Sequence, residues 1–255
     1  MIRLHPCISC CIFLLGIIFS SGCQNSDSYT TSGASPVQFD AADDPSGIPQ
    51  DKIAICVWPV VGLRREPGRK DYTSGPNPQA NYLLPVYYGE RVECIGNTDT
   101  VESENRVYMK IRLQDGEEGW VYEELFEKSG RLAVIVGESE LYRRPDLMTL
   151  RDERLKIGEI VVVLEQKDGW IHVSGNKKAK KGWIREVSGF SFKQDDLKVA
   201  LLLYKARQLS DPLEQKERLQ HILDDESLAG SGLIEQVQAG ITLIEQEISS
   251  PEREN

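Results

Sequence analysis

One pattern occurs twice in this sequence, and it limits the possible folds more than any other feature. Gly89-Glu90 is followed by Gly119-Trp120, and Gly158-Glu159 is followed in the same way by Gly182-Trp183. Three further landmarks recur in the same order. They pair residues 53–57 with 132–136, residues 63–67 with 141–145, and residues 108–111 with 170–173. Landmarks that match in order indicate an internal repeat rather than a chance recurrence.

Both copies have the pattern of short β-strands. The second copy, residues 155–187, reads as four β segments separated by the turn Lys167-Asp168-Gly169 and by a lysine-rich turn at residues 175–181. We expect the glycine of each Gly-Trp pair to let two strands approach where a side chain would clash. Each tryptophan is expected to cover the mouth of a barrel. Polar insertions in the first copy, at residues 68–82 and 98–106, are predicted to be loops.

Each copy resembles a bacterial SH3-type (SH3b) domain. Residues 62–67 and 140–145 stand in place of the family's Leu-Asn-Val-Arg-x-x-Pro motif, and the Gly-Glu pairs, residues 168–173 and the Gly-Trp pairs complete the likeness. Arg64 and Tyr142 replace the family's Asn, and the first copy lacks the Asp-Gly-Trp turn. The resemblance covers about residues 52–190 and implies two tandem, small, five-stranded, partly open β-barrels. The resemblance indicates the fold specifically but gives little information about the ligand.

The N-terminus has the pattern of a targeting segment. Arg3 precedes an apolar run at residues 8–19 that is too short to span a bilayer comfortably. Ser20-Ser21-Gly22-Cys23 resembles the lipobox of bacterial lipoproteins, with Ser20 in place of the usual Leu. This resemblance implies diacylglycerol and palmitate on Cys23 after cleavage, and Gln24 then favours the outer membrane. The alternatives are an ordinary secretory signal cut near Gly22 and an uncleaved anchor.

A tether is predicted after the lipidation site. Residues 24–50 are rich in Ser, Thr, Gly, Pro, Asp and Ala, which cannot bury enough surface to offset chain entropy. Such a flexible chain spans roughly 30 Å. Cys7, Cys10 and Cys11 leave with the signal, so that Cys56 and Cys94 alone remain in the folded part. We expect both to be free core residues, although an exported compartment permits a disulfide between them.

The period of the apolar residues changes to that of a helix from Asp195 onward. Leu197, Ala200, Leu201, Tyr204 and Leu209 form one apolar stripe. Asp211-Pro212 predicts the start of a second helix, and a third follows Gly230-Ser231-Gly232. The side of this third helix that faces the core is predicted to comprise Leu233, Ile234, Val237, Ile241, Ile244 and Ile248. Residues 194–255 contain 6 Lys and Arg against 13 Asp and Glu, so this helical bundle is acidic.

Two groups of side chains are candidates for ligand binding. In the first repeat they are Arg64, Arg65, Tyr72, Tyr82 and Tyr88, and in the second Lys177, Lys178, Lys180 and Lys181. The SH3b resemblance implies that the aromatic and arginine side chains contact a wall peptide or glycan, and the lysines suit phosphate or carboxylate groups. The alternative interpretation is that the tyrosines are ordinary strand residues and the lysines a solvated hairpin tip.

Other functional classes find little support. His5, His172 and His221 lack any nearby nucleophile motif or metal-ligand spacing, so we expect no catalysis, metal or other cofactor. Residues 51–193 carry 23 basic and 23 acidic side chains, and the whole chain has a formal net charge of −10, which together with export argues against nucleic-acid binding.

The expected protein is therefore a non-enzymatic envelope lipoprotein of the β-plus-α class that binds or scaffolds at the cell wall. Its segments are a signal peptide (1–22), a lipidated flexible tether (23–50), two SH3b-like repeats (51–128 and 129–192), a helical bundle (193–249) and a disordered tail (250–255). The alternative function is that of an accessory or sensory subunit that binds an envelope protein through the barrels and the acidic helices.

Overall fold

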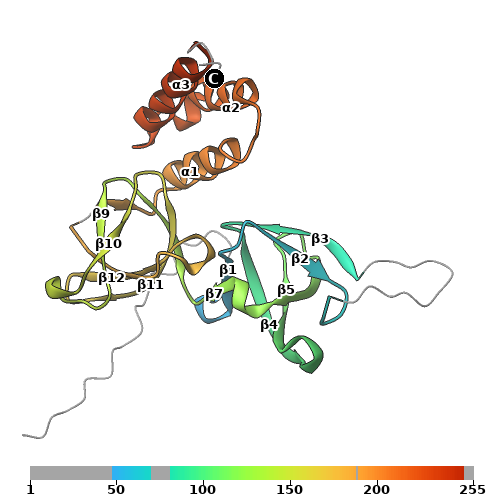
Figure 1. Ribbon diagram of the computed structural model, residues 1–255. Coiled ribbons are helices and arrows are strands. Elements are labelled where there is room, and N and C mark those ends of the chain that lie inside the picture. Colours follow the sequence, from blue (N-terminus) through green and yellow to red (C-terminus); the bar gives the residue numbers. More distant parts are fainter. Residues whose placement is uncertain (1–47, 70–80, 188, 250–255) are drawn as a thin grey trace, which may run out of the picture. The chain divides into compact units, whose positions relative to one another are not determined.

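The computed structural model describes residues 48–69, 81–187 and 189–249, all of which fall in one compact unit of the chain. The fold is mixed β plus α, with two antiparallel sheets followed by three α-helices in the described part (Figure 1). The predicted signal peptide and lipidation site, and all of the tether except its last three residues, lie outside the described residues.

The first sheet has seven antiparallel strands in the order β3-β2-β6-β5-β4-β1-β7. The strands are β1 (Ile53–Cys56), β2 (Val60–Arg64), β3 (Tyr82–Tyr87), β4 (Arg91–Val101), β5 (Arg106–Arg112), β6 (Glu118–Tyr122) and β7 (Phe126–Lys128). Five strands per barrel were expected, and the sheet has seven.

The second sheet repeats this topology strand for strand, in the order β10-β9-β13-β12-β11-β8-β14. Its strands are β8 (Arg131–Ile135), β9 (Ser139–Tyr142), β10 (Leu150–Leu155), β11 (Ile160–Lys167), β12 (Trp170–Ser174), β13 (Gly182–Arg185) and β14 (Phe190–Ser191). The two sheets thus share one strand order, as the internal repeat in the sequence predicts. Neither sheet is closed by pairing between its two end strands.

One predicted loop is in part a strand. Thr98–Val101 continue β4 and pair with β5, in a register that places Thr98 opposite Met109 and Val101 opposite Arg106. The turn between them ends at Asn105, whose left-handed backbone (φ 51°) reverses the chain. The prediction of a loop over residues 98–106 was therefore wrong for its first four residues and for Arg106, because polar residues form strands where a partner strand satisfies their backbone. Residues 70–80 of the other insertion lie outside the described residues.

The Gly-Trp pairs bring two strands close together, as predicted. A Cβ atom on Gly119 would lie 2.7 Å from the carbonyl oxygen of Arg64, and one on Gly182 would lie 2.6 Å from that of Tyr142. No side chain fits at such distances. Trp120 and Trp183 are half-buried and belong to neither sheet core, because side chains alternate in direction along a strand.

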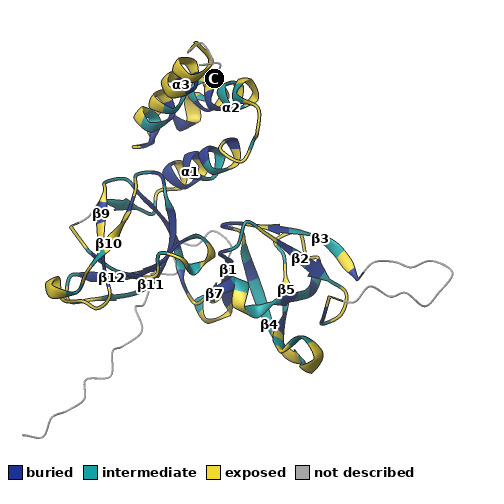
Figure 2. Cartoon of the chain, in the orientation of Figure 1, coloured by how far each residue is buried: buried dark blue, intermediate teal, exposed yellow. Residues whose placement is uncertain are grey.

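Each sheet encloses a core of its own, and a third cluster combines residues of both sheets with the helices. Figure 2 shows the buried positions along the strands in dark blue. Cys56 is fully buried in the first core, and burial raises the pKa of its thiol to about 12. Cys94 is half-buried, and both cysteines are free thiols. Cys56 is thus a core residue, as expected.

The helices are α1 (Gln194–Ala206), α2 (Pro212–Asp224) and α3 (Ile234–Ser249). The second begins as predicted, because the Asp211 carboxylate accepts a hydrogen bond of 2.9 Å from the backbone nitrogen of Leu213 and proline occupies the first turn. Ile248 was expected to point inward but is 49 % exposed, since the last turn of α3 extends past the residues it packs against. None of the described helices is both long and apolar enough to cross a bilayer.

Candidate functional site

Two tyrosines and an arginine lie together on the first sheet. Tyr108 on β5 is directly opposite Tyr122 on β6, and their ring centroids are 6.0 Å apart. The guanidinium carbon of Arg106 lies 4.7 Å from the centroid of the Tyr122 ring, within the range of a cation–π contact. We call these side chains the first aromatic–arginine cluster. Tyr108 is buried, whereas Tyr122 and Arg106 are half-buried and can stack on a planar group or offer positive charge to an anionic one.

Glu104 connects the two long hairpins that flank this cluster. Its carboxylate accepts a hydrogen bond of 2.7 Å from the backbone nitrogen of Arg69, at the base of the β2–β3 hairpin, and another of 2.7 Å from the Tyr108 hydroxyl. The backbone bond from Arg69, followed by the Tyr108 hydroxyl, holds the pKa of Glu104 below its usual value despite some desolvation. The Glu104 carboxylate therefore stays ionised and keeps the β4–β5 turn against the base of the other hairpin.

The same hairpin base is tied a second time by Asn81. The side-chain nitrogen of Asn81 donates to the carbonyl oxygens of Gly68 (2.8 Å) and Glu66 (3.1 Å), and its side-chain oxygen accepts from the backbone nitrogen of Glu66 (3.0 Å). Asn81 is only 2 % exposed. The two ends of the β2–β3 connection are thus held together by buried side-chain bonds, although the sequence analysis had not singled out Asn81.

The predicted ligand residues of the first repeat occupy different environments. Arg64 is half-buried on β2 opposite Trp120, close enough to Tyr108 for its charge to act on the pKa of that phenol. Arg65 and Tyr82 are exposed. Tyr88 is buried instead, and its hydroxyl donates a 2.7 Å hydrogen bond to the carbonyl oxygen of Ile160 in the second sheet. Tyr72 lies outside the described residues.

The lysine-rich turn of the second repeat contacts other parts of the chain. The ammonium groups of Lys181 and Lys178 lie 3.1 and 3.8 Å from a carboxylate oxygen of Glu127, which is only 7 % exposed. Lys180 pairs with Glu159. The backbone nitrogen of Lys177 donates to the carbonyl oxygen of Val57 at 2.7 Å. The turn therefore joins the two repeats, a role that neither of the sequence interpretations included.

The second sheet has a matching group of side chains that the sequence analysis missed. Tyr142 on β9 and Trp170 on β12 meet edge to face with centroids 5.0 Å apart, and the guanidinium carbon of Arg185 lies 4.8 Å from the Trp170 ring. The landmark offsets match Trp170 to Tyr108 and Arg185 to Tyr122. We call this group the second aromatic–arginine cluster. The sequence analysis missed it because residue class changes at two of the three aligned positions, from Arg64 to Tyr142 and from Tyr122 to Arg185.

A cavity of about 360 Å³ lies among the helices. Its lining comes mainly from α1 and α2 and combines apolar with charged side chains. The lining residues are Leu202, Lys205, Ala206, Leu209, Arg218, His221, Ile222, Asp225 and Leu228. The Asp225 carboxylate lies 3.4 Å from the ammonium group of Lys198, so the lining carries charges of both signs.

The two described histidines occupy different environments, His172 on β12 and His221 on α2. His172 stacks on Trp183 with centroids 4.9 Å apart, and burial followed by the nearby Lys181 charge lowers its pKa. His221 lies 3.7 Å from the carboxylate of Glu217 on the same helix. Within the residues that the structure describes, no group of three or more His, Cys, Asp or Glu side chains is arranged to hold a metal ion.

Comparison with known proteins assigns no family to the chain. No protein-family model and no curated protein sequence matches it. Among solved structures, NlpC2 from Trichomonas vaginalis is 17 % identical with a TM-score of 0.23, and the match covers 62 % of this chain and 55 % of that one. NlpC1 from the same organism is 17 % identical with a TM-score of 0.24, over 64 % and 48 % of the two chains. The chain spans about half the length of these proteins, and a likeness this weak carries no argument.

Proposed function

We propose that this chain is a non-enzymatic envelope lipoprotein that binds cell-wall peptide or glycan through two SH3b-like barrels. The observation that carries the proposal is the first aromatic–arginine cluster, in which the half-buried Tyr122 and Arg106 lie against each other beside two hairpins. A partly exposed tyrosine beside an arginine can stack on a planar or apolar group and pair with a carboxylate.

The pairing of the strands supports a partly open barrel in each repeat. β1 pairs with β4 on one side and β7 on the other, while β2 meets β6 at a single residue pair, Arg64 opposite Trp120. The second sheet does the same, with Trp183 opposite Tyr142. Where two neighbouring strands share only one residue pair, the sheet can bend sharply. Such a bend lets each sheet curve around its own hydrophobic core.

The first cluster is the better candidate for the ligand site. It has Arg64, Arg69 and Arg106 nearby, and two hairpins flank it. Wall stem peptides carry carboxylates, which bind arginine in charge-assisted pairs, and sugar rings stack on tyrosine. In this proposal Tyr122 and Arg106 contact the ligand, while Glu104 and Tyr108 position the hairpins around it.

Co-sedimentation with purified sacculi tests the wall-binding role. We expect the unlipidated Cys23→Ser chain to sediment with sacculi, and a Tyr122→Ala/Arg106→Gln variant to bind about thirtyfold more weakly, since side chains central to an interface each contribute about 1 kcal/mol or more. Tyr87→Ala is the matched control, because Tyr87 is an exposed tyrosine on β3 of the same sheet. Failure of the unsubstituted chain to sediment would rule out wall binding.

Lipid anchoring is tested separately in cells. Cys23→Ser should move the protein from the membrane fraction to the soluble fraction, because two or more acyl chains hold a protein on a bilayer stably and none does so. Mass spectrometry of the mature N-terminus should then find acyl groups on Cys23 of the unsubstituted chain. An N-terminus produced by cleavage elsewhere would indicate an ordinary secretory signal.

A protein partner is the second candidate function. The observation that favours it is the apolar surface of α3, where Leu243 is 66 % and Ile248 is 49 % exposed on an otherwise acidic bundle. Crosslinking in intact cells from positions on α3 should then capture one protein. Crosslinks to that protein together with an absence of sacculus binding would favour the role of an accessory or sensory subunit.

A further inference from the structure

Three apolar side chains are exposed at the end of the β9–β10 hairpin. The tip is the 3-10 turn Leu147–Thr149, in which Leu147 is 62 % exposed and Met148 is 90 % exposed. Leu150, the first residue of β10, is 52 % exposed. Single exposed apolar residues are ordinary on protein surfaces, but three within four positions of one turn form a patch that needs a reason.

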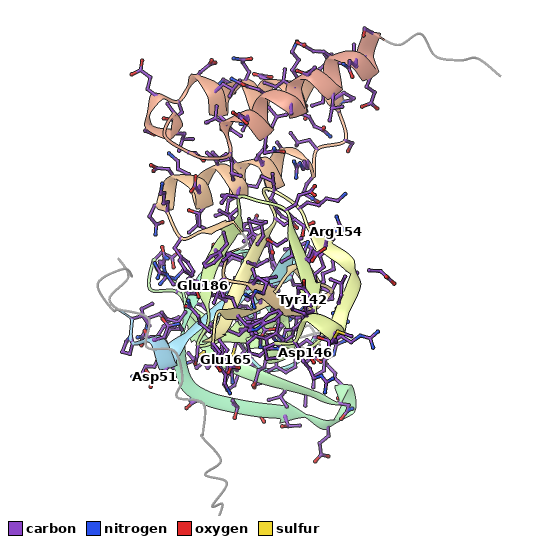
Figure 3. The ribbon with its side chains drawn as sticks, turned by 90° about the vertical axis from the view of Figure 1, so that its left-hand side faces the viewer. Asp51, Tyr142, Asp146, Arg154, Glu165 and Glu186 are labelled. Carbon is purple, nitrogen blue, oxygen red and sulfur yellow. The ribbon has the colours of Figure 1, made fainter. Side chains whose placement is uncertain are left out.

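Hydrogen bonds within the turn hold these side chains away from the sheet. The Asp146 carboxylate accepts from the backbone nitrogen of Met148 at 3.0 Å. The Thr149 hydroxyl donates to the carbonyl oxygen of Asp146 at 2.7 Å and accepts from the backbone nitrogen of Arg144 at 3.1 Å. Figure 3 labels Tyr142, Asp146 and Arg154 along this hairpin. Because the backbone of the tip is tied in this way, Leu147 and Met148 cannot fold back onto the core without breaking these bonds.

Positive charge surrounds the apolar tip. Arg143 and Arg144 are exposed, and neither side chain forms a hydrogen bond or ion pair with any residue that the structure describes. Arg151 donates to the carbonyl oxygen of Lys181 at 2.8 Å and pairs with Glu153. Arg143 and Arg144 precede the tip, whereas the exposed acids Asp152 and Glu153 follow it on β10. The tip therefore carries two arginines, on its β9 side, that no described acidic side chain pairs with.

We infer that this tip inserts into the surface of an anionic lipid bilayer. Leu147 and Met148 would enter the boundary between head groups and acyl chains, and Arg143 and Arg144 would contact lipid phosphates. An anionic bilayer offers apolar acyl chains to the apolar side chains and phosphates to the arginines. A purely polar or purely apolar partner would suit only one of these two groups. The inference does not depend on wall binding, and it also holds for a chain that carries no lipid.

Vesicle binding of an unlipidated chain tests the inference without the anchor. The strands, helices and core residues that the structure describes all lie between residues 48 and 249, so a chain that begins at residue 24 retains every one of them. We expect this chain to sediment with phosphatidylcholine vesicles that contain phosphatidylglycerol and to bind vesicles of phosphatidylcholine alone about tenfold more weakly.

Two double variants separate the apolar and the electrostatic contributions. Leu147→Ser/Met148→Ser should weaken binding to the anionic vesicles by about tenfold, and Arg143→Gln/Arg144→Gln should remove most of the preference for phosphatidylglycerol. Leu213→Ser and Arg207→Gln, at exposed positions of the helical part, are the matched controls and should bind normally. Circular dichroism should show all four variants folded, because the substituted side chains are exposed.

Several outcomes would overturn the inference. These are equal binding to neutral and anionic vesicles, an unchanged affinity of the Leu147→Ser/Met148→Ser variant, and no sedimentation of the unsubstituted chain. A photocrosslinker at position 148 that captures a protein in cells, combined with a failure to bind vesicles, would assign the tip to a protein partner instead. Sacculus binding can succeed or fail independently of each of these results.

Discussion

Each of the two sheets builds an aromatic–arginine cluster, and different hairpins surround the two clusters. In the first sheet, long β2–β3 and β4–β5 hairpins flank Tyr108 and Tyr122, and Glu104 ties one hairpin to the base of the other. In the second sheet, the hairpin at the corresponding position is short and presents the apolar tip with Met148 to solvent. One scaffold thus supports two different surfaces, because the strands determine where a cluster lies and the hairpins determine what can reach it.

The last strands of the two sheets differ in a similar way. Glu127 on β7 and Ser191 on β14 occupy equivalent pairing positions, opposite Ile55 and Val134. Glu127 accepts from the Ser174 hydroxyl at 2.8 Å and pairs with lysines of the second repeat, while the Ser191 hydroxyl donates at 2.5 Å to Asp196 of α1. Each repeat therefore uses the same position to bond to the part of the chain that follows it.

The strongest test of the equivalence of the two sheets is to fill the space beside each Gly-Trp pair. Gly119→Ala and Gly182→Ala should each lower the free energy of unfolding by about 2 kcal/mol, because the new methyl group would overlap a backbone carbonyl that cannot move aside. Urea denaturation measures both. Gly230→Ala is the control, since a Cβ there has no neighbour within 4 Å. A large loss of stability at one glycine and none at the other would show that the close approaches of strands at Gly119 and Gly182 are not equivalent.

A second test compares the two connections. Asp196 is 3 % exposed, and although burial raises its pKa, the hydrogen bonds from Ser191, Ser231 and the Gly232 backbone nitrogen outweigh this and lower it. Asp196→Asn should cost about 2 kcal/mol of stability at neutral pH, since these bonds go to a charged group. Glu127→Gln should cost less, about 1 kcal/mol, because its lysine partners are 30 % and 41 % exposed and solvent screens them.

The pH dependence of stability checks this assignment for Asp196. A carboxyl group with a lowered pKa stabilises the fold at pH values above its ordinary pKa of 3.8, and this contribution is lost as the pH falls through the lowered value. The unsubstituted protein should therefore lose stability in that acid range more steeply than Asp196→Asn. Asp152→Asn, at an exposed position of β10, is the matched control. If Glu127→Gln lowers the free energy of unfolding more than Asp196→Asn does, the predicted order of the two connections is wrong.

The smallest predicted effect concerns an imidazole that only the second sheet has. His172 stacks on Trp183, whereas the matching position of the first sheet is Lys110, opposite Trp120. Because burial lowers the pKa of His172 from about 6.5, the unfolded chain binds the proton more readily, and stability should fall slightly as the pH drops through 6.5. Nuclear magnetic resonance should find the His172 pKa below 6.5, and Lys181→Gln should raise it. A value above 6.5 would contradict the buried stacking.

The features that were predicted correctly depend on neighbours in sequence or on simple periodicity. The Asp211 cap, the close approach at Gly119 and Gly182, and the recurrence of one strand order all follow from short motifs that carry their own geometry. The features that were missed depend on distant partners. Thr98–Val101 form a strand because Arg106–Met109 pair with them, and no local propensity indicates this.

The amino-acid sequence by itself determined the duplication, the change from strands to helices and the positions of the Gly-Trp corners, since periodicity and glycine chemistry act locally. Only the tertiary structure decided the roles of the candidate binding residues. Tyr88 is buried because its hydroxyl meets Ile160, 72 residues later, and Lys181 meets Glu127, 54 residues earlier. Whether a tyrosine or a lysine faces solvent or a partner depends on which segments fold against it, and that information is distributed over the whole chain.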